Sequence, residues 1–103
     1  MTITDVVILD DAAQDLVDGK VFYDTQELGV GSYFWDSLLS DIESLTIYAG
    51  VHERHFGLFR LLSRRFPFSI YYEVSGNVAF VIAVFPMRKN PLRIRDKLTG
   101  RDH

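Results

Sequence analysis

One uninterrupted apolar run limits most strongly what this chain can fold into. Eight consecutive residues, 78–85, carry no polar side chain, and most of them are β-branched or aromatic. This length and composition predict a strand that is buried on both faces or nearly so. We therefore expect the run to lie in the centre of a β-sheet.

Three further strands are predicted from shorter segments. Residues 58–63 and 66–74 have strand character, and the Ser75-Gly76-Asn77 break before the apolar run is short and turn-forming. Such a break predicts a β-hairpin between residues 66–74 and 78–85. Near the N-terminus, Val6-Val7-Ile8-Leu9 is a short β-branched stretch that also predicts a strand.

Two amphipathic helices are predicted between the first strand and the second. Asp10 and Asp11 stand where the N-cap of the first helix is expected, and Gly29 and Gly31 interrupt the pattern before Ser32, which can cap a second helix. The inward-facing positions of the first helix are Ala12, Ala13, Leu16, Gly19 and Tyr23, and those of the second are Phe34, Leu38, Ile42 and Leu45, flanked by Trp35 and Leu39. Because the connection is tight, we expect an antiparallel helical hairpin.

The predicted order is therefore β-α-α-β-β-β, an α+β fold in which the hairpin covers the sheet. With 103 residues the chain has room for one core, so residues 1–103 are expected to form a single domain. Residues 87–103 form a basic tail, in which Pro91 either opens a short helix or heads a loose end.

Charge is distributed unevenly along the chain. Residues 1–53 hold one Lys and eleven Asp or Glu, whereas residues 54–103 hold ten Lys or Arg and three Asp or Glu, so the two halves carry -10 and +7 and the whole chain -3. Clustered positive charge favours a polyanion or an acidic partner, because it concentrates anions nearby. The alternatives are attraction between the halves within one fold, or arginines that form a solvated edge.

Cysteine is absent, which excludes disulfides, thiolate metal ligands and a thiol nucleophile and fits a reducing compartment. The N-terminus has no basic start followed by an apolar stretch, and no apolar run approaches the roughly 20 residues that span a bilayer. A cytoplasmic location without membrane contact is expected.

Several segments, in order and spacing, resemble the ParE/RelE toxin superfamily, the plasmid-stabilisation toxins of type II toxin–antitoxin systems. They are residues 13–23, Leu28-Gly29-Val30-Gly31 with Phe34, Phe59-Arg60, residues 65–74, Ala83-Val84 and Arg88-Lys89-Asn90-Pro91. The resemblance implies an open, mainly antiparallel sheet packed against a helical hairpin. It also implies a cognate antitoxin, which we expect to cover apolar patches beside the hairpin and the sheet.

Within this superfamily, RelE-like members cut messenger RNA in the ribosome with basic side chains and a terminal Tyr, whereas ParE-like members poison DNA gyrase by binding it. Arg60 and Arg88 match the nuclease pattern, but Leu62 and Ser69 replace basic residues, and no Tyr follows Tyr72. Each lost group typically lowers the rate about 100-fold or more. The resemblance is therefore closer to ParE and favours a toxin that binds a target such as gyrase. The alternatives are a RelE-type mRNA endoribonuclease that uses Arg60 and Arg88, and a degenerate, non-toxic member that retains antitoxin binding.

The candidate target-binding residues are Arg60, Arg65, Arg88 and Arg93, because a guanidinium offers a planar fork to phosphate or carboxylate. Arg60 and Arg88 both have the alternative of an ion pair with the acidic helices. Arg64 and Arg65 point to opposite faces if their strand continues, so one of them is expected to be solvated. Arg93, Arg95 and Lys97 form either a basic stripe or a mobile end.

Two other groups of residues have features that can occur in binding sites. His52, Glu53 and His55 have a spacing that allows metal ligation, but too few ligands surround them, so neither a metal nor a cofactor is expected. Tyr71 and Tyr72 alternate across a strand, which predicts one ring in the core and the other outside, with nucleotide stacking as a minor alternative.

Overall fold

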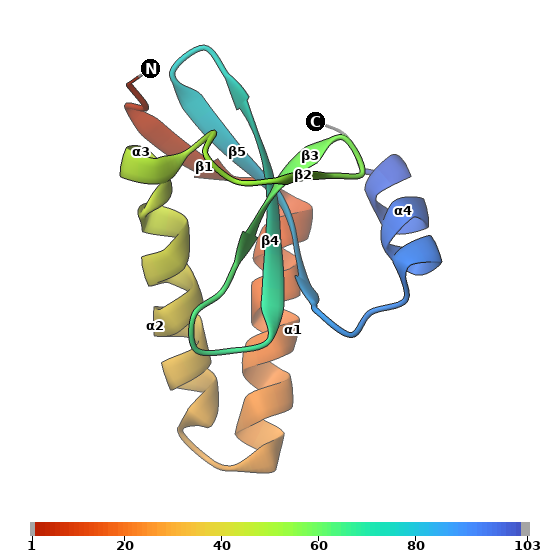
Figure 1. Cartoon of the computed structure of the whole chain (residues 1–103). Coiled ribbons are helices and arrows are strands. Elements are labelled where there is room, and N and C mark those ends of the chain that lie inside the picture. The colour runs from red at the N-terminus through yellow and green to blue at the C-terminus, as the bar shows by residue number, and fades with distance from the viewer. Residues whose placement is uncertain (1, 102–103) are drawn as a thin grey trace.

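The computed structural model describes residues 2–101, and the predicted elements are all present in it. Their order is β1 (Asp5–Ile8), α1 (Asp10–Gln26), α2 (Val30–Glu43), α3 (Leu45–Tyr48), β2 (Arg54–His55), β3 (Leu58–Leu62), β4 (Phe68–Ser75), β5 (Val78–Pro86) and α4 (Pro91–Thr99). The α+β class is confirmed (Figure 1). The elements without a predicted counterpart are the short helix α3 and the two-residue strand β2, whereas the terminal helix α4 is one of the two alternatives predicted for the tail.

The five strands form one sheet in the order β1-β5-β4-β3-β2. Strand β1 runs parallel to β5, and the other three pairs are antiparallel, so the mainly antiparallel prediction is confirmed. Strand β5 lies between β1 and β4, as the apolar run predicts. Residues 81–85 of this strand are at most 3% exposed, because both faces of the sheet are covered.

The α1–α2 hairpin covers one face of the sheet, and helix α4 packs on the other (Figure 1). The hairpin-side core contains Leu16, Phe34, Leu38, Ile42, Phe68, Ile70, Tyr72, Val81 and Val84, among others. The α4-side core contains Leu58, Tyr71, Ile82, Ala83, Phe85, Ile94 and Leu98. A register shift in the β4–β5 pairing sets Tyr71 opposite Ala83 and Tyr72 opposite Val81, so Ile82 is an extra residue in β5. This bulge turns both Ile82 and Ala83 toward α4.

Helix α4 decides between the two alternatives for the tail and corrects the expectation for the two tyrosines. Residues 91–99 are a helix and not a loose, mobile end, because Ile94 and Leu98 lie one turn apart and bury an apolar stripe against the sheet. Since α4 covers the second face, Tyr71 and Tyr72 are both buried, at 1% and 0% exposure, and neither ring faces outward for stacking. The last two residues of the predicted tail, 102–103, lie outside the described residues.

The two long helices begin differently from the prediction. Leu9 is the N-cap of α1, so Asp10 and Asp11 occupy its first turn, where their charges are favourable to the helix dipole. Helix α2 begins at Val30 after Gly29, whose φ of 96° places it in the left-handed region, and Ser32 is not the cap.

Helix α1 supplies the cap that α2 lacks. The Gly31 N–H lies in the first turn of α2, where an N–H has no acceptor within its own helix. It donates instead to Asp24 Oδ1 at 2.8 Å. The helices approach so closely here that a Cβ on Gly31 would lie 2.3 Å from the Lys20 backbone oxygen. Only glycine fits this contact.

The hydrogen bond from Gly31, with the Lys20 ammonium as a lesser cause, lowers the pKa of Asp24 below its ordinary value. A depressed folded-state pKa stabilises the fold fully above the unfolded pKa of about 4, and this contribution is lost as the pH falls through the folded value. We therefore expect the stability advantage of wild type over Asp24→Asn to be constant at neutral pH and to shrink below about pH 4. Urea titrations of both proteins between pH 2.5 and 7 measure it. An advantage that does not vary with pH would contradict this assignment.

Strand β3 ends at Leu62, which changes the expectation for the two arginines that follow. Arg64 and Arg65 lie in the β3–β4 connection and not on a strand, so the argument that they alternate between two faces does not apply. Asp41 of α2 fixes this connection by accepting hydrogen bonds from Ser63 Oγ at 2.8 Å and from the Arg64 N–H at 3.2 Å. Arg65 is exposed.

Candidate functional site

Arg60 lies in the middle of β3, on the α4 side of the sheet. It pairs with Tyr71, which belongs to the α4-side core, and residues opposite each other on neighbouring strands point to the same face. Its side chain is half-buried. The acidic hairpin covers the other face of the sheet, so the geometry does not support the alternative of an ion pair between Arg60 and the acidic helices.

Leu62 and Ser69 lie next to each other on this same face. They are cross-strand partners, and Ser69 also pairs with Phe85 in β5, so the three side chains form one row beside Arg60. Ser69 is buried at 3% exposure. At both positions where the nuclease pattern has a basic residue, the sheet therefore presents an uncharged side chain.

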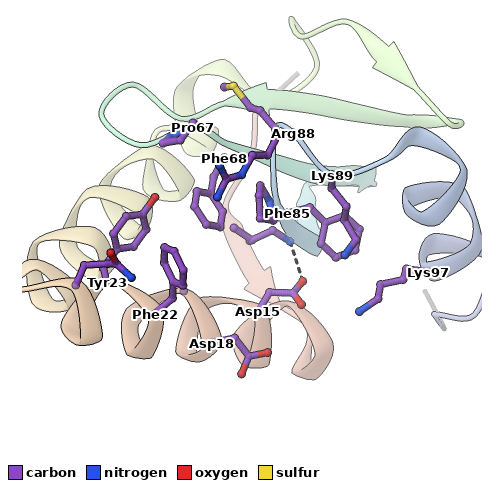
Figure 2. A pocket seen from close by; sticks show the side chains of 15 residues that line it. Asp15, Asp18, Phe22, Tyr23, Pro67, Phe68, Phe85, Arg88, Lys89 and Lys97 are labelled. Atoms are coloured by element: carbon purple, nitrogen blue, oxygen red, sulfur yellow. Dashed lines mark hydrogen bonds between the residues drawn. The ribbon is translucent and has the colours of Figure 1, made fainter.

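Arg88 lies in the turn after β5. The Met87 N–H donates to the Pro67 carbonyl at 2.8 Å, which ties this turn to the start of β4. From the turn Arg88 lines a cleft of about 760 Å³ between α1, the ends of β4 and β5, and α4 (Figure 2). Neither Arg60 nor Arg65 lines this cleft.

Aromatic rings form much of the cleft wall. Phe22 and Tyr23 belong to α1, Phe68 is the first residue of β4, and Phe85 lies near the end of β5. The Phe22 and Tyr23 rings meet edge to face with centroids 5.1 Å apart, and Phe22 remains 48% exposed. An aromatic side chain with that much exposure beside a hollow is available to a ligand.

Lys89 and Lys97 bring positive charge to the same cleft. The Lys89 Nζ lies 5.2 Å from the centre of the Phe85 ring. Burial lowers the pKa of Lys89, and the positive charges of Lys97 and Arg93 lower it further. The structure thus gathers Lys89, Arg93 and Lys97 into one cluster, which we call the basic rim.

The carboxylate of Asp15 is already engaged at the cleft. Arg101 Nη1 donates to Asp15 Oδ2 at 2.7 Å, Arg101 Nη2 donates to Oδ1 at 2.9 Å, and the Val84 N–H donates to Oδ2 at 2.9 Å. Arg101 Nη1 also donates to the Ile82 carbonyl at 3.0 Å. Strand β1 pairs with β5 only as far as Val81, so Asp15 and Arg101 complete the hydrogen bonds of the strand edge beyond it.

The four predicted target-binding arginines therefore lie in different parts of the structure. Arg60 is half-buried on β3, Arg65 is exposed in the β3–β4 connection, Arg88 lines the cleft, and Arg93 belongs to the basic rim. Sequence reasoning missed Lys89, Asp15 and Arg101. The i, i+4 spacing of Arg93 and Lys97 on a helix was the available signal that these two share a side.

The histidines considered as metal ligands have other contacts. His52 Nδ1 is hydrogen-bonded to the Tyr72 hydroxyl, which also accepts from the Gly50 N–H at 2.9 Å, and burial lowers the pKa of His52. His55 Nε2 lies 3.4 Å from Glu53 Oε2. Within residues 2–101, no three His, Cys, Asp or Glu side chains are grouped to hold a metal ion.

Comparison with known proteins gives a strong structural likeness. No protein-family model matches the sequence, and no curated protein matches it. A solved structure titled "Chromosomal ParDE TA system from P. aeruginosa" is similar, with a TM-score of 0.75 and 16% sequence identity over 84% of this chain and 98% of that chain. At this identity the likeness concerns the fold, and it confirms the ParE/RelE-like fold that the sequence predicts. None of the helices in residues 2–101 is both long enough and apolar enough to cross a membrane.

Proposed function

We propose that this chain is the toxin component of a type II toxin–antitoxin system and acts in the cytoplasm by binding a cellular target such as DNA gyrase. The observation that carries this proposal is the fold, which matches a protein of a ParDE system over 98% of that protein's chain. The segments that resemble the ParE/RelE superfamily support it, because they lie on the elements that build this fold.

A binding mode of action is favoured over RNA cleavage by the row of side chains beside Arg60. Phosphodiester cleavage needs groups that offset developing negative charge and groups that transfer protons. Leu62 and Ser69 are uncharged and cannot offset the developing negative charge. Tyr71 and Tyr72 are buried, and both precede the region where the terminal Tyr of the nuclease pattern is expected. Arg88 lines the cleft and Arg60 does not, so this cleft does not combine the two arginines.

The target is bound, in this proposal, by Arg60, Arg65, Arg88 and Arg93. Arg65, Arg88 and Arg93 are exposed, and Arg60 is half-buried on the face opposite the acidic hairpin. Exposed and half-buried arginines such as these favour a target surface rich in carboxylate or phosphate.

A cognate antitoxin is the second partner in this proposal. Val17 and Val21 lie one turn apart on α1 and remain 41% and 57% exposed. Adjacent exposed apolar side chains on a helix commonly mark a protein contact. We assign this strip of α1 to the antitoxin, and we expect Val21→Asp to abolish co-purification with a neighbouring small protein encoded beside this gene.

The decisive experiment is a supercoiling assay with purified gyrase and purified toxin. Dose-dependent inhibition that is relieved by the co-expressed antitoxin supports the proposal. Absence of inhibition at saturating toxin would count against gyrase, and primer extension on translated messages would then reveal cleavage if the chain is an endoribonuclease. A chain that forms the antitoxin complex but neither arrests growth nor alters transcripts would be a non-toxic member.

Arg88→Ala is expected to leave the fold intact and to weaken toxicity. The side chain is exposed, and losing one charge-assisted hydrogen bond to a target costs about 1.5–3 kcal/mol, which corresponds to roughly 10- to 100-fold weaker inhibition. The concentration for half-maximal inhibition and the thermal midpoint measure the two effects. Arg95→Ala, an exposed arginine on α4 outside the cleft, is the matched control. Equal toxicity of Arg88→Ala and wild type would remove Arg88 from the target-binding surface.

A further inference from the structure

We propose that the cleft between α1 and α4 binds a small molecule that joins a flat ring to a phosphate, of the nucleoside monophosphate class. This inference goes beyond the proposed function and does not depend on it. Three features of the cleft carry it: its size, its aromatic end and its basic end.

The size of the cleft fits a small molecule. A volume of about 760 Å³ lies within the roughly 300–1,000 Å³ of typical ligand pockets. The walls come from α1, from the ends of β4 and β5, and from α4, which are packed elements and not loops alone. The hollow is therefore largely formed before a ligand arrives, and little ordering free energy is needed.

The two ends of the cleft differ in chemistry. Figure 2 shows Phe22 and Tyr23 at one end, and Lys89 and Lys97 at the other. An aromatic side chain offers a flat ring a stacking surface, and ammonium groups offer an anion several donors. A ligand with a ring at one end and a charge at the other complements both ends at once.

The charge at the basic end calls for an anion. Asp15 lines the cleft, but its oxygens accept three hydrogen bonds from Arg101 and the Val84 N–H, and Asp18 accepts one from Gln14 Nε2 at 2.9 Å. Arg101 offsets the charge of Asp15, which leaves the carboxylate of Asp18 against three cations of the cleft lining, Arg88, Lys89 and Lys97. Burial is the main cause of the lowered pKa of Lys89, and the positive charges of Lys97 and Arg93 add to it, whereas Asp15 opposes it. A phosphate dianion between Lys89 and Lys97 offsets these positive charges.

The test uses adenosine monophosphate as the probe, titrated into the full chain by calorimetry and by amide NMR. We expect saturable binding that shifts the amides of cleft residues such as Gly19, Val84 and Lys89. Lys97→Ala and Phe22→Ala should each weaken this binding about tenfold or more, because each removes one of the two complementary ends. Both side chains are exposed, so both variants are expected to fold, which circular dichroism checks.

Arg95→Ala serves as the control, since it removes a cation from the same helix outside the cleft and should leave the affinity unchanged. Four results would overturn the proposal: no binding at millimolar probe, shifts that map away from the cleft, inorganic phosphate binding as tightly as the nucleotide, or adenosine doing so. Binding of a single-stranded oligonucleotide without binding of the mononucleotide would assign the surface to nucleic acid instead. None of these results bears on gyrase inhibition, so the proposed function stands or falls separately.

Discussion

Leu38→Asp is expected to unfold the protein. Leu38 is 0% exposed and lies in the core between the α1–α2 hairpin and the sheet, where Phe34 and Ile42 are its neighbours on α2. The substitution removes the apolar contacts of a leucine and places a carboxylate in a site without a partner. The first effect alone costs about 2–5 kcal/mol and the second adds several more, which together reach the 5–15 kcal/mol stability of a typical domain. Far-ultraviolet circular dichroism at pH 7 and 25 °C measures the result.

Ser40→Asp is the matched control, because it adds the same carboxylate to the exposed side of the same helix. We expect its free energy of unfolding to lie within about 0.5 kcal/mol of wild type. A cooperative transition of Leu38→Asp at the wild-type urea midpoint would mean that α2 does not cover the sheet as described.

The elements whose apolar residues follow a regular pattern along the chain were predictable from the sequence. The unbroken apolar run identified β5 as a central strand, and residues spaced by three and four positions identified the inward side of α2. The caps were not predictable, because the group that satisfies the Gly31 N–H is Asp24, which belongs to the preceding helix. Local sequence rules place a cap beside its own helix, so they pointed to Ser32 instead.

Helix α4 and strand β2 were harder to predict from the sequence, for a different reason. The buried side of α4 rests mainly on Ile94 and Leu98, and its remaining residues are mostly charged, so the segment resembles a solvated tail until a sheet face is known to need covering. Strand β2 has only two residues and forms because Phe56 and Gly57, with φ of 57° and 81°, turn the chain back onto β3. No periodicity exists in a strand of that length.

The candidate site was predictable only residue by residue. The resemblance selected Arg60 and Arg88, but strand direction, the bulge at Ile82 and the turn after β5 decide which surface each of them reaches. The contact between Asp15 and Arg101 joins residues 86 positions apart, and no motif links them. Contacts of this kind follow from the assembled fold and not from local sequence.

Asp15→Ala is expected to destabilise the protein by about 2–4 kcal/mol. The side chains of Asp15 and Arg101 are only 13% and 11% exposed, so the pair is largely removed from water. Deleting the carboxylate takes from Arg101 the two hydrogen bonds to Asp15 and leaves the Val84 N–H without this acceptor. Asp11 Oδ2, 3.9 Å from Arg101 Nε, compensates only in part because it is 64% exposed. Breaking one side of a buried pair costs more than the pair itself contributes.

A double-mutant cycle with Arg101→Met separates the two parts of this cost. If the loss comes mainly from a guanidinium deprived of its carboxylate, adding Arg101→Met to Asp15→Ala should restore about 1–2 kcal/mol, since methionine also packs on Phe85. If it comes mainly from the Val84 N–H, the double variant should be no more stable than Asp15→Ala, and hydrogen exchange at Val84 should accelerate equally in both. Asp18→Ala, an exposed carboxylate one turn along α1, should change stability by less than about 0.5 kcal/mol. An equally small effect of Asp15→Ala would show that α4 remains on the sheet without this contact, and that Ile94 and Leu98 alone hold it there.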